Sequence, residues 1–174
     1  MSAFDGQADL LATLIASTAT FQSVTGMSTV ATAKERIALP EALDDDTAEA
    51  HAVPYPRAII TDGSLIERRS AATGTWRGTG SLFLAFEFEA PPDKRTELTQ
   101  RAWFLNKVST LLREAEVISD SRATPSGYSS THLVLRSYRR VAGPFVVAPA
   151  RREQPDDSEA ELRPLWAIEF EVEY

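Results

Sequence analysis

The stretch from Gly78 to Ala90, GTGSLFLAFEFEA, is the longest uninterrupted strand pattern in the chain, and it limits the possible folds more than any other segment. Its apolar side chains alternate with a second set, which places the two sets on opposite faces of a strand. The first set is Leu82, Leu84, Phe86 and Phe88, and the second is Phe83, Ala85, Glu87 and Glu89. The pattern predicts a strand inside a sheet, with one face in the core and the acidic end of the other face in water.

The segment Leu165 to Tyr174 repeats this alternation, so the two strands suit the same sheet. Its apolar set is Trp166, Ile168, Phe170, Val172 and Tyr174, alternating with Ala167, Glu169, Glu171 and Glu173. Pro164 marks the start of this final strand. A helix that covers one side of a mainly antiparallel sheet is the simplest way to bury so many aromatic side chains.

The segment from Lys94 to Ile118 predicts that helix. Its apolar stripe comprises Leu98, Ala102, Leu105, Val108, Leu112 and Ala115, widened by Phe104 and Leu111. This stripe is broad enough to cover a sheet. Trp103 falls instead on the polar side, with Lys107, Thr110 and Glu114. An indole in that position needs cover, either from a second protein or from another segment of its own chain, such as residues 21–39.

The N-terminal third is less regular. Leucine and isoleucine at helical spacing predict a helix from Asp5 to Thr20. Met27 to Thr32 fits a short strand, and Ala33 to Leu39 fits either strand or loop. The acidic run Glu41 to Ala50 is interpreted as a surface excursion that ends at the turn Val53-Pro54-Tyr55-Pro56.

Two hairpins are expected next. Arg57 to Thr61 predicts a strand, Asp62-Gly63 a tight turn, and Leu65 to Ser70 the returning strand. A second turn at residues 71–75 then leads into the strand that contains Gly78 to Ala90, which predicts a longer hairpin with a projecting tip. Pro91 and Pro92 end that strand, and Asp93 is the predicted N-cap of the following helix.

Beyond the helix, the chain predicts a loop over Asp120 to Ser130 and a strand over His132 to Val141. Gly143-Pro144 interrupts this strand, so Phe145 to Val147 is either its continuation or a separate edge piece. The charged segment Ala150 to Arg163 is interpreted as a connection.

In chain order, these elements predict one α+β domain over residues 1–174. Two main helices are expected to pack on a mixed, mostly antiparallel sheet with a projecting long hairpin. The length of 174 residues is sufficient for a core without disulfides, and the chain contains no cysteine. A net charge of −7 argues against general binding of nucleic acid. With no basic leader pattern and no long apolar run, we expect a soluble intracellular protein.

No arrangement of residues predicts catalysis, a cofactor or a metal. Asp44, Asp45, Asp46, Glu49 and His51 are the only group that resembles a metal site, but they lack the glycine-centred spacing of a calcium loop. Gly78 and Gly80 precede a strand rather than a helix, which excludes a dinucleotide motif, and no nucleophile elbow is present. Glu87 and Glu89 share one face and are weighed as paired carboxylates against a solvated acidic sheet face.

The chain instead carries signs of association. Arg68-Arg69 and Arg139-Arg140 lie in predicted strands, where neighbouring side chains point to opposite faces, so we expect ion pairs with the acidic rows within one chain or between chains. Aromatic and arginine side chains are enriched at interfaces. The candidate interface residues are Thr73, Thr75, Trp76, Arg77, Trp103, Arg139 and Arg140.

The order of these elements resembles the tail terminator proteins of long-tailed bacteriophages and the related head-tail joining and minor tail proteins. The segments that carry the resemblance are Tyr55 to Ile60 (YPRAII), Gly78 to Ala90, the helix Trp103 to Ile118 and Leu165 to Tyr174. The acidic segment Glu41 to Val53 and the charged segment Ala150 to Arg163 depart from a minimal version of that fold.

The resemblance implies a structural protein without catalytic residues that forms a ring, commonly hexameric, on the finished tail tube. The implied partners are further copies of the chain, tail-tube and head-connector proteins, and DNA that passes through the lumen, with no membrane. The implied location is the virion tail, and the cytoplasm of the host or lysogen during assembly. The alternatives are a small ligand-binding or hydrolytic domain that uses Glu87, Glu89 and nearby arginines, and an adaptor that binds another protein through Trp103.

Overall fold

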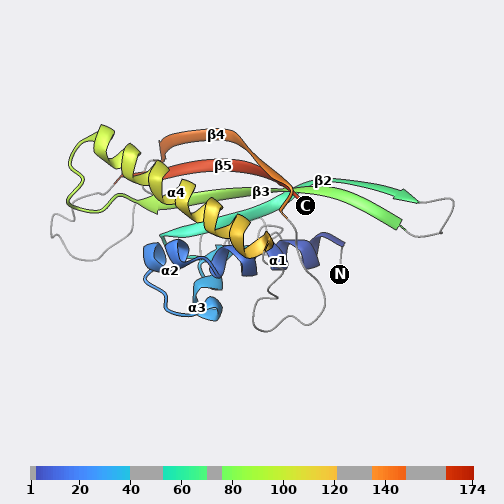
Figure 1. Cartoon of the computed structure of the whole chain (residues 1–174). Helices are drawn as coiled ribbons and strands as arrows, with labels where there is room; N and C mark the ends of the chain where they lie inside the picture. Colours follow the sequence, from blue (N-terminus) through green and yellow to red (C-terminus); the bar gives the residue numbers. More distant parts are fainter. Residues whose placement is uncertain (1–2, 40–52, 70–75, 121–134, 148–163) are drawn as a thin grey trace.

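The computed structural model describes residues 3–39, 53–69, 76–120, 135–147 and 164–174, and the side chains within them except at 3–5, 65–69 and 76–79. Figure 1 shows helices gathered on one face of a single sheet. In chain order the elements are α1 (Ala3–Ala16), α2 (Ala19–Thr25), α3 (Val30–Lys34), β1 (Ile37–Ala38), β2 (Arg57–Arg69), β3 (Trp76–Glu89), α4 (Glu97–Asp120), β4 (Ser137–Val147) and β5 (Leu165–Glu173). The predicted α+β class is confirmed.

The five strands form one sheet in the order β1-β2-β3-β5-β4. The short β1 is parallel to β2, and every other neighbouring pair is antiparallel, so the sheet is mixed and mostly antiparallel as predicted. The strands β2 and β3 continue past the sheet as a two-stranded projection (Figure 1). The predicted projecting hairpin is therefore present.

The core lies between the sheet and the helices α1 and α4. The apolar sets predicted on β3 and β5 are opposite each other and buried, with Leu84 paired to Phe170 and Phe86 to Ile168. Aromatic rings connect the sheet to α4, since the Phe104 ring lies 5.8 Å from that of Phe88 and 6.3 Å from that of Trp166. The alternation in the sequence thus predicts this part of the core correctly.

The buried face of α4 is rotated and shortened relative to the predicted stripe. The buried residues are Phe104, Val108, Leu111, Leu112, Ala115 and Ser119. Leu98 is 77% exposed, and Ala102 is exposed as well. The predicted core positions Leu98 and Ala102 are therefore wrong. Ala102 lies within one turn of the fully buried Phe104, so the rotation of the buried face accounts for its exposure.

The helix α4 also begins later than predicted, at Glu97. The Thr96 hydroxyl accepts a hydrogen bond from the backbone N–H of Thr99, which is the N-cap contact predicted for Asp93. Asp93 forms an ion pair with Lys94 instead. The prediction of an Asp93 cap is wrong because Asp93 lies in a separate turn, in which the Lys94 N–H donates to the Pro91 carbonyl before the helix begins.

The predicted helix from Asp5 to Thr20 is two helices. The Thr18 hydroxyl donates to the carbonyl of Ile15 and accepts from the N–H of Phe21, so it ends α1 and caps α2. The strand proposed for Met27 to Thr32 is also wrong, because α3 begins at Val30 with Thr29 as its cap. Within Ala33 to Leu39, only the two residues of β1 are extended.

Asp62 and Gly63 form an irregularity in a continuous strand rather than a turn. The pairing of β2 with β3 shifts register between Asp62 and Leu65, as at a β-bulge. A Cβ atom at Gly63 would collide with the backbone carbonyl of Ser81 on the facing strand. Glycine at this position therefore allows the close approach of two strands, and the prediction of two successive hairpins is replaced by one long hairpin.

The strand β4 begins at Ser137 rather than His132 and runs through Gly143-Pro144. The pairing of β4 with β5 shifts register between Arg140 and Phe145, and Gly143 has a φ of 86°, which favours glycine. Phe145 to Val147 is thus the continuation of the strand. His132 and the predicted segments 41–50, 121–130 and 150–163 lie outside the described residues.

Candidate assembly surfaces

The sheet face opposite α4 carries acidic side chains that are paired with arginines of neighbouring strands. Arg57 of β2 is opposite Glu87 of β3, and its Nε donates to a Glu87 carboxylate oxygen at 2.6 Å. Arg57 is only 5% exposed. Its other nitrogens donate to the Val53 carbonyl and the Tyr55 hydroxyl, and its guanidinium carbon lies 4.4 Å from the Tyr55 ring centre. This cluster ties the segment before β2 to the central strand.

A second ion pair joins β4 to β5 on the same face. Arg139 is opposite Glu171, and its guanidinium donates to the Glu171 carboxylate. The bond from Arg139, assisted by a hydrogen bond from Ser81, lowers the pKa of Glu171 below its ordinary value of 4.5. The same bond raises the pKa of Arg139. The predicted pairing of arginines with the acidic rows is therefore confirmed for Arg139 within one chain. The pair of Arg57 with Glu87 was not predicted, and the side chains of Arg68 and Arg69 lie outside the described ones.

Glu171 is expected to titrate below pH 4.5, and the substitution Arg139→Ala should move its midpoint upward, because the hydrogen bond from Arg139 is the largest cause of the shift. A carboxyl group whose pKa is lowered by folding stabilises the fold above its unfolded pKa, and this contribution is lost as the pH falls through the folded pKa. The side-chain carboxyl carbon shift in an NMR titration measures the midpoint. Arg140→Ala is the matched control and should leave it unchanged.

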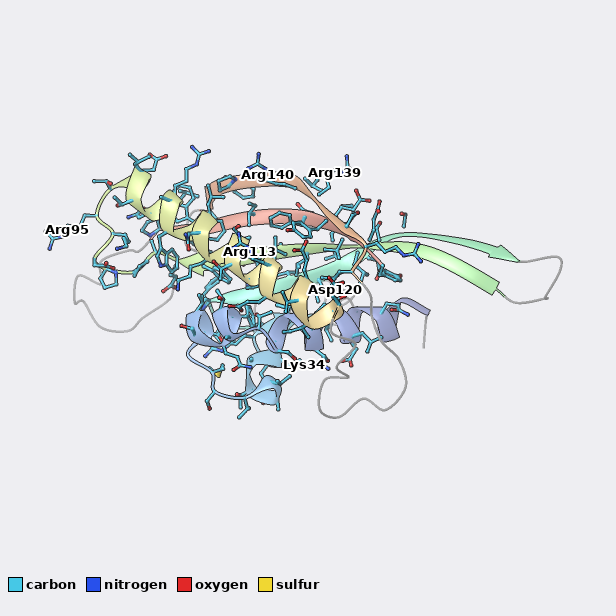
Figure 2. The ribbon with its side chains drawn as sticks, viewed as in Figure 1. Lys34, Arg95, Arg113, Asp120, Arg139 and Arg140 are labelled. Carbon is cyan, nitrogen blue, oxygen red and sulfur yellow. The ribbon has the colours of Figure 1, made fainter. Side chains whose placement is uncertain are left out.

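The strand β4 is an edge of the sheet with an apolar surface. Of the five large apolar side chains that are exposed among the described residues, three lie on this strand. They are Val141, Phe145 and Val146, each 47–49% exposed. Exposed arginines accompany them, and Figure 2 shows Arg139 and Arg140 along β4 at the upper edge of the view. An edge strand that exposes backbone groups and apolar side chains is a place where another strand can pair.

The opposite side of the sheet has a second open edge. The strand β1 covers β2 only at Ala58 and Ile59. Among the described residues, nothing pairs with that side of β2 from Ile60 to Arg69. The residues Ile66–Arg69 of β2 and Trp76–Thr79 of β3 pair only with each other among the described residues, and we call this part the ribbon. An isolated two-stranded ribbon has little stability of its own.

The structure places the candidate interface residues in three different parts of the molecule. Trp76 and Arg77 lie in the ribbon, Arg139 and Arg140 lie on β4, and Thr73 and Thr75 lie outside the described residues. Trp103 is half-buried and packs against the core of its own chain. The described candidate residues therefore belong to three separate parts of one copy, namely the ribbon, β4 and α4, and they form no single site.

The side of α4 that carries Trp103 faces the N-terminal helices rather than open solvent. Glu114, on the same side, accepts hydrogen bonds at 2.8 Å from both the backbone N–H and the hydroxyl of Thr20. The polar appearance of this side in the sequence is explained by these contacts with α2. The described structure therefore gives Trp103 cover from its own chain.

The exposure of Val141 and Val146 was not predicted from the sequence. The apolar run Phe145-Val146-Val147 after Gly143-Pro144 was a usable signal, since an edge strand was one of the two interpretations considered there. The exposure of these side chains depends on β4 being outermost, which alternation alone does not reveal. The strand order supplies that information.

Glu87, one of the two carboxylates weighed as a catalytic pair, is bound to a buried arginine. No group of three or more metal-ligating side chains occurs among the described residues, and Asp44, Asp45, Asp46, Glu49 and His51 lie outside them.

None of the described helices combines the length and the apolar character needed to cross a membrane. Comparison with known families found no protein-family model that matches the chain. Comparison with curated proteins also found no match.

Proposed function

We propose that the chain is a structural protein that associates with further copies of itself to form a closed ring on a phage or prophage tail. The observation that carries this proposal is the pair of open edges on opposite sides of one sheet, β4 on one side and β2 beyond Ile59 on the other. A protein with two different open edges can join identical copies head to tail, with each copy using both edges.

The exposed apolar side chains on β4 support the idea that this edge is buried against another copy of the chain rather than left in water. Soluble proteins usually protect an edge strand by covering it or by placing charges and proline on it. The strand β4 has exposed arginines and Pro144, and yet it exposes Val141, Phe145 and Val146. Burial of those side chains against a second copy would stabilise the assembly by removing apolar area from water.

In the proposed role, the ring caps the tail tube and faces the head connector, and DNA passes through its lumen. These partners, and the location in the virion tail, follow from the resemblance of the element order to tail terminator and head-tail joining proteins. The proposed role uses no catalytic group. The engagement of Glu87 by Arg57 supports the structural role over the ligand-binding or hydrolytic alternative.

The absolute mass of the purified chain tests this proposal. Light scattering on a size-exclusion peak should give one discrete multiple of 19.1 kDa over a wide range of protein concentrations. A head-to-tail contact that closes fixes the number of subunits, whereas one that does not close gives open filaments of variable mass. A monomer at every concentration, or a continuous distribution of masses, would contradict the proposal.

A further inference from the structure

We infer that neighbouring copies join when β4 of one copy pairs antiparallel with the open part of β2 of the next, with Arg140 opposite Asp62. This inference rests on the proposed function and adds the contact surface to it. In this contact, the strand that pairs with the β4 edge belongs to a second copy of this chain. Three independent features of the described structure support the choice, namely strand direction, the extent of each open edge, and charge.

Strand direction makes the two edges compatible. Since β2, β3, β5 and β4 are antiparallel in succession, β4 runs opposite to β2. A rotation about a ring axis carries one copy onto the next without reversing strands relative to that axis. The strand β4 of one copy therefore meets β2 of the next in antiparallel orientation, the same relation as most pairs within the sheet.

The extent of the open edges limits where the strands can pair. On β2, the neighbour must avoid Ala58 and Ile59, which β1 already covers. On β4, the register shift after Arg140 interrupts regular pairing, and Pro144 donates no backbone hydrogen bond. The segments clear of β1 and of the β4 register shift are Ser137–Arg140 of β4 and the part of β2 that begins at Ile60, within which the pairing of β2 with β3 shifts register between Asp62 and Leu65. Pairing these segments offsets the two copies along the strands, as closure of a sheet into a ring requires.

The charges of Arg140 and Asp62, and the sheet face on which both side chains lie, agree with this pairing. Within the sheet, Arg140 is opposite Phe170 and Asp62 is opposite Leu82, so both lie on the face that carries the helices. Both side chains are exposed, and neither forms an ion pair with a described residue of its own chain. Opposite charges on facing strands and on the same face stabilise a sheet, while like charges destabilise it.

The same register limits how far the two strands can stay paired. Phe145 is three pairing steps beyond Arg140, as counted along β5 from Phe170 to Ala167. Three steps from Asp62 along β2 of the next copy lead to Ile59, whose open side β1 already fills. In this contact β4 must therefore diverge from β2 of the next copy after Arg140, where its own pairing with β5 shifts register.

A charge-swap experiment tests the inference with light scattering as the readout. Arg140→Glu and Asp62→Arg should each raise the protein concentration at which the oligomer dissociates by about tenfold or more, because each places like charges together. The double variant Arg140→Glu/Asp62→Arg restores opposite charges and should return that concentration to within about threefold of the wild type. Arg95→Glu is the matched control, since it changes the charge at an exposed site at the far end of the molecule and should have no effect (Figure 2).

The outcomes separate this inference from the proposed function. If the wild type assembles and either single variant assembles equally well, or if the double variant is no better than the singles, the contact surface is wrong and the ring proposal stands. A monomeric wild type would overturn both. Thermal unfolding of each variant, followed by circular dichroism at a protein concentration at which wild type and variants are all monomeric, should match that of the wild type because both positions are exposed. Loss of assembly then cannot be attributed to misfolding.

Discussion

Replacing Arg57 with alanine is expected to lower the free energy of unfolding by about 3–5 kcal/mol, because it leaves the Glu87 carboxylate without its partner in a largely buried position. The loss also removes the hydrogen bonds from the guanidinium to Val53 and Tyr55. For a domain whose total stability is about 5–15 kcal/mol, this is a large fraction. Urea unfolding followed by tryptophan fluorescence measures the change.

The control for Arg57→Ala removes both charges. The double variant Arg57→Met/Glu87→Leu should be much closer to the wild type than Arg57→Ala, since apolar residues of similar volume often replace a buried ion pair at little cost. A result in which Arg57→Ala changes the unfolding free energy by less than about 1 kcal/mol would mean that the pair is well solvated. Glu87 would then be free for another role, and the ligand-binding alternative would regain support.

Leu111→Ala is expected to cost about 2–5 kcal/mol, since the Leu111 side chain is fully buried between α4 and the sheet and its removal leaves a cavity. Leu98→Ala removes the same atoms from the same helix and is the matched control. Leu98 is 77% exposed, so its substitution should change the unfolding free energy by less than about 0.5 kcal/mol. Urea unfolding of the two variants, measured side by side, gives both values.

The comparison of Leu111 with Leu98 also tests the face of α4 directly. Equal costs at the two positions would contradict the orientation of the helix described above. Large costs at both positions would restore the stripe that the sequence spacing favours, because that stripe includes Leu98 and Leu111. Only the described orientation gives a large cost at Leu111 together with a small one at Leu98.

The parts of the fold that could be predicted from the sequence are those in which one physical signal dominates. From Leu84 to Glu89 in β3 and from Trp166 to Glu173 in β5, large apolar residues alternate with acidic or small ones, and the structure buries the apolar set of each. The pattern of α4 predicted a long helix for similar reasons. Its orientation was predicted less well, because Leu98 has the spacing of the predicted stripe, whereas the buried face of α4 is rotated and leaves Leu98 77% exposed.

The errors occur where one local signal has two structural meanings. Asp62-Gly63 is a strong turn signal, but here the glycine permits close contact with Ser81 inside a continuous strand. Threonine occurs both inside helices and at their ends, so its presence at position 18 does not reveal a helix boundary. Its two hydrogen bonds show that Thr18 separates α1 from α2. Tertiary contacts decide such cases, and they are not encoded in neighbouring residues.

The candidate surfaces were predictable only in part. The alternation of charge indicated that Arg68-Arg69 and Arg139-Arg140 would pair with the acidic rows, and Arg139 does so. The buried pair of Arg57 with Glu87 was not predicted. The open edges could not be predicted, because they follow from the order of the strands. A strand that is third or fourth in the sheet and one that is outermost can have the same sequence pattern.

The position of β5 in the strand order has a consequence for synthesis on the ribosome. This strand follows all the other described strands along the chain, yet it lies between β3 and β4. Until it leaves the ribosome, β4 has no neighbour on which to form, while β2 and β3 can already pair with each other. In the proposed assembly, a chain that stops before β5 lacks the β4 edge and therefore cannot complete a ring. Nascent and truncated chains would be excluded from the finished particle by topology alone.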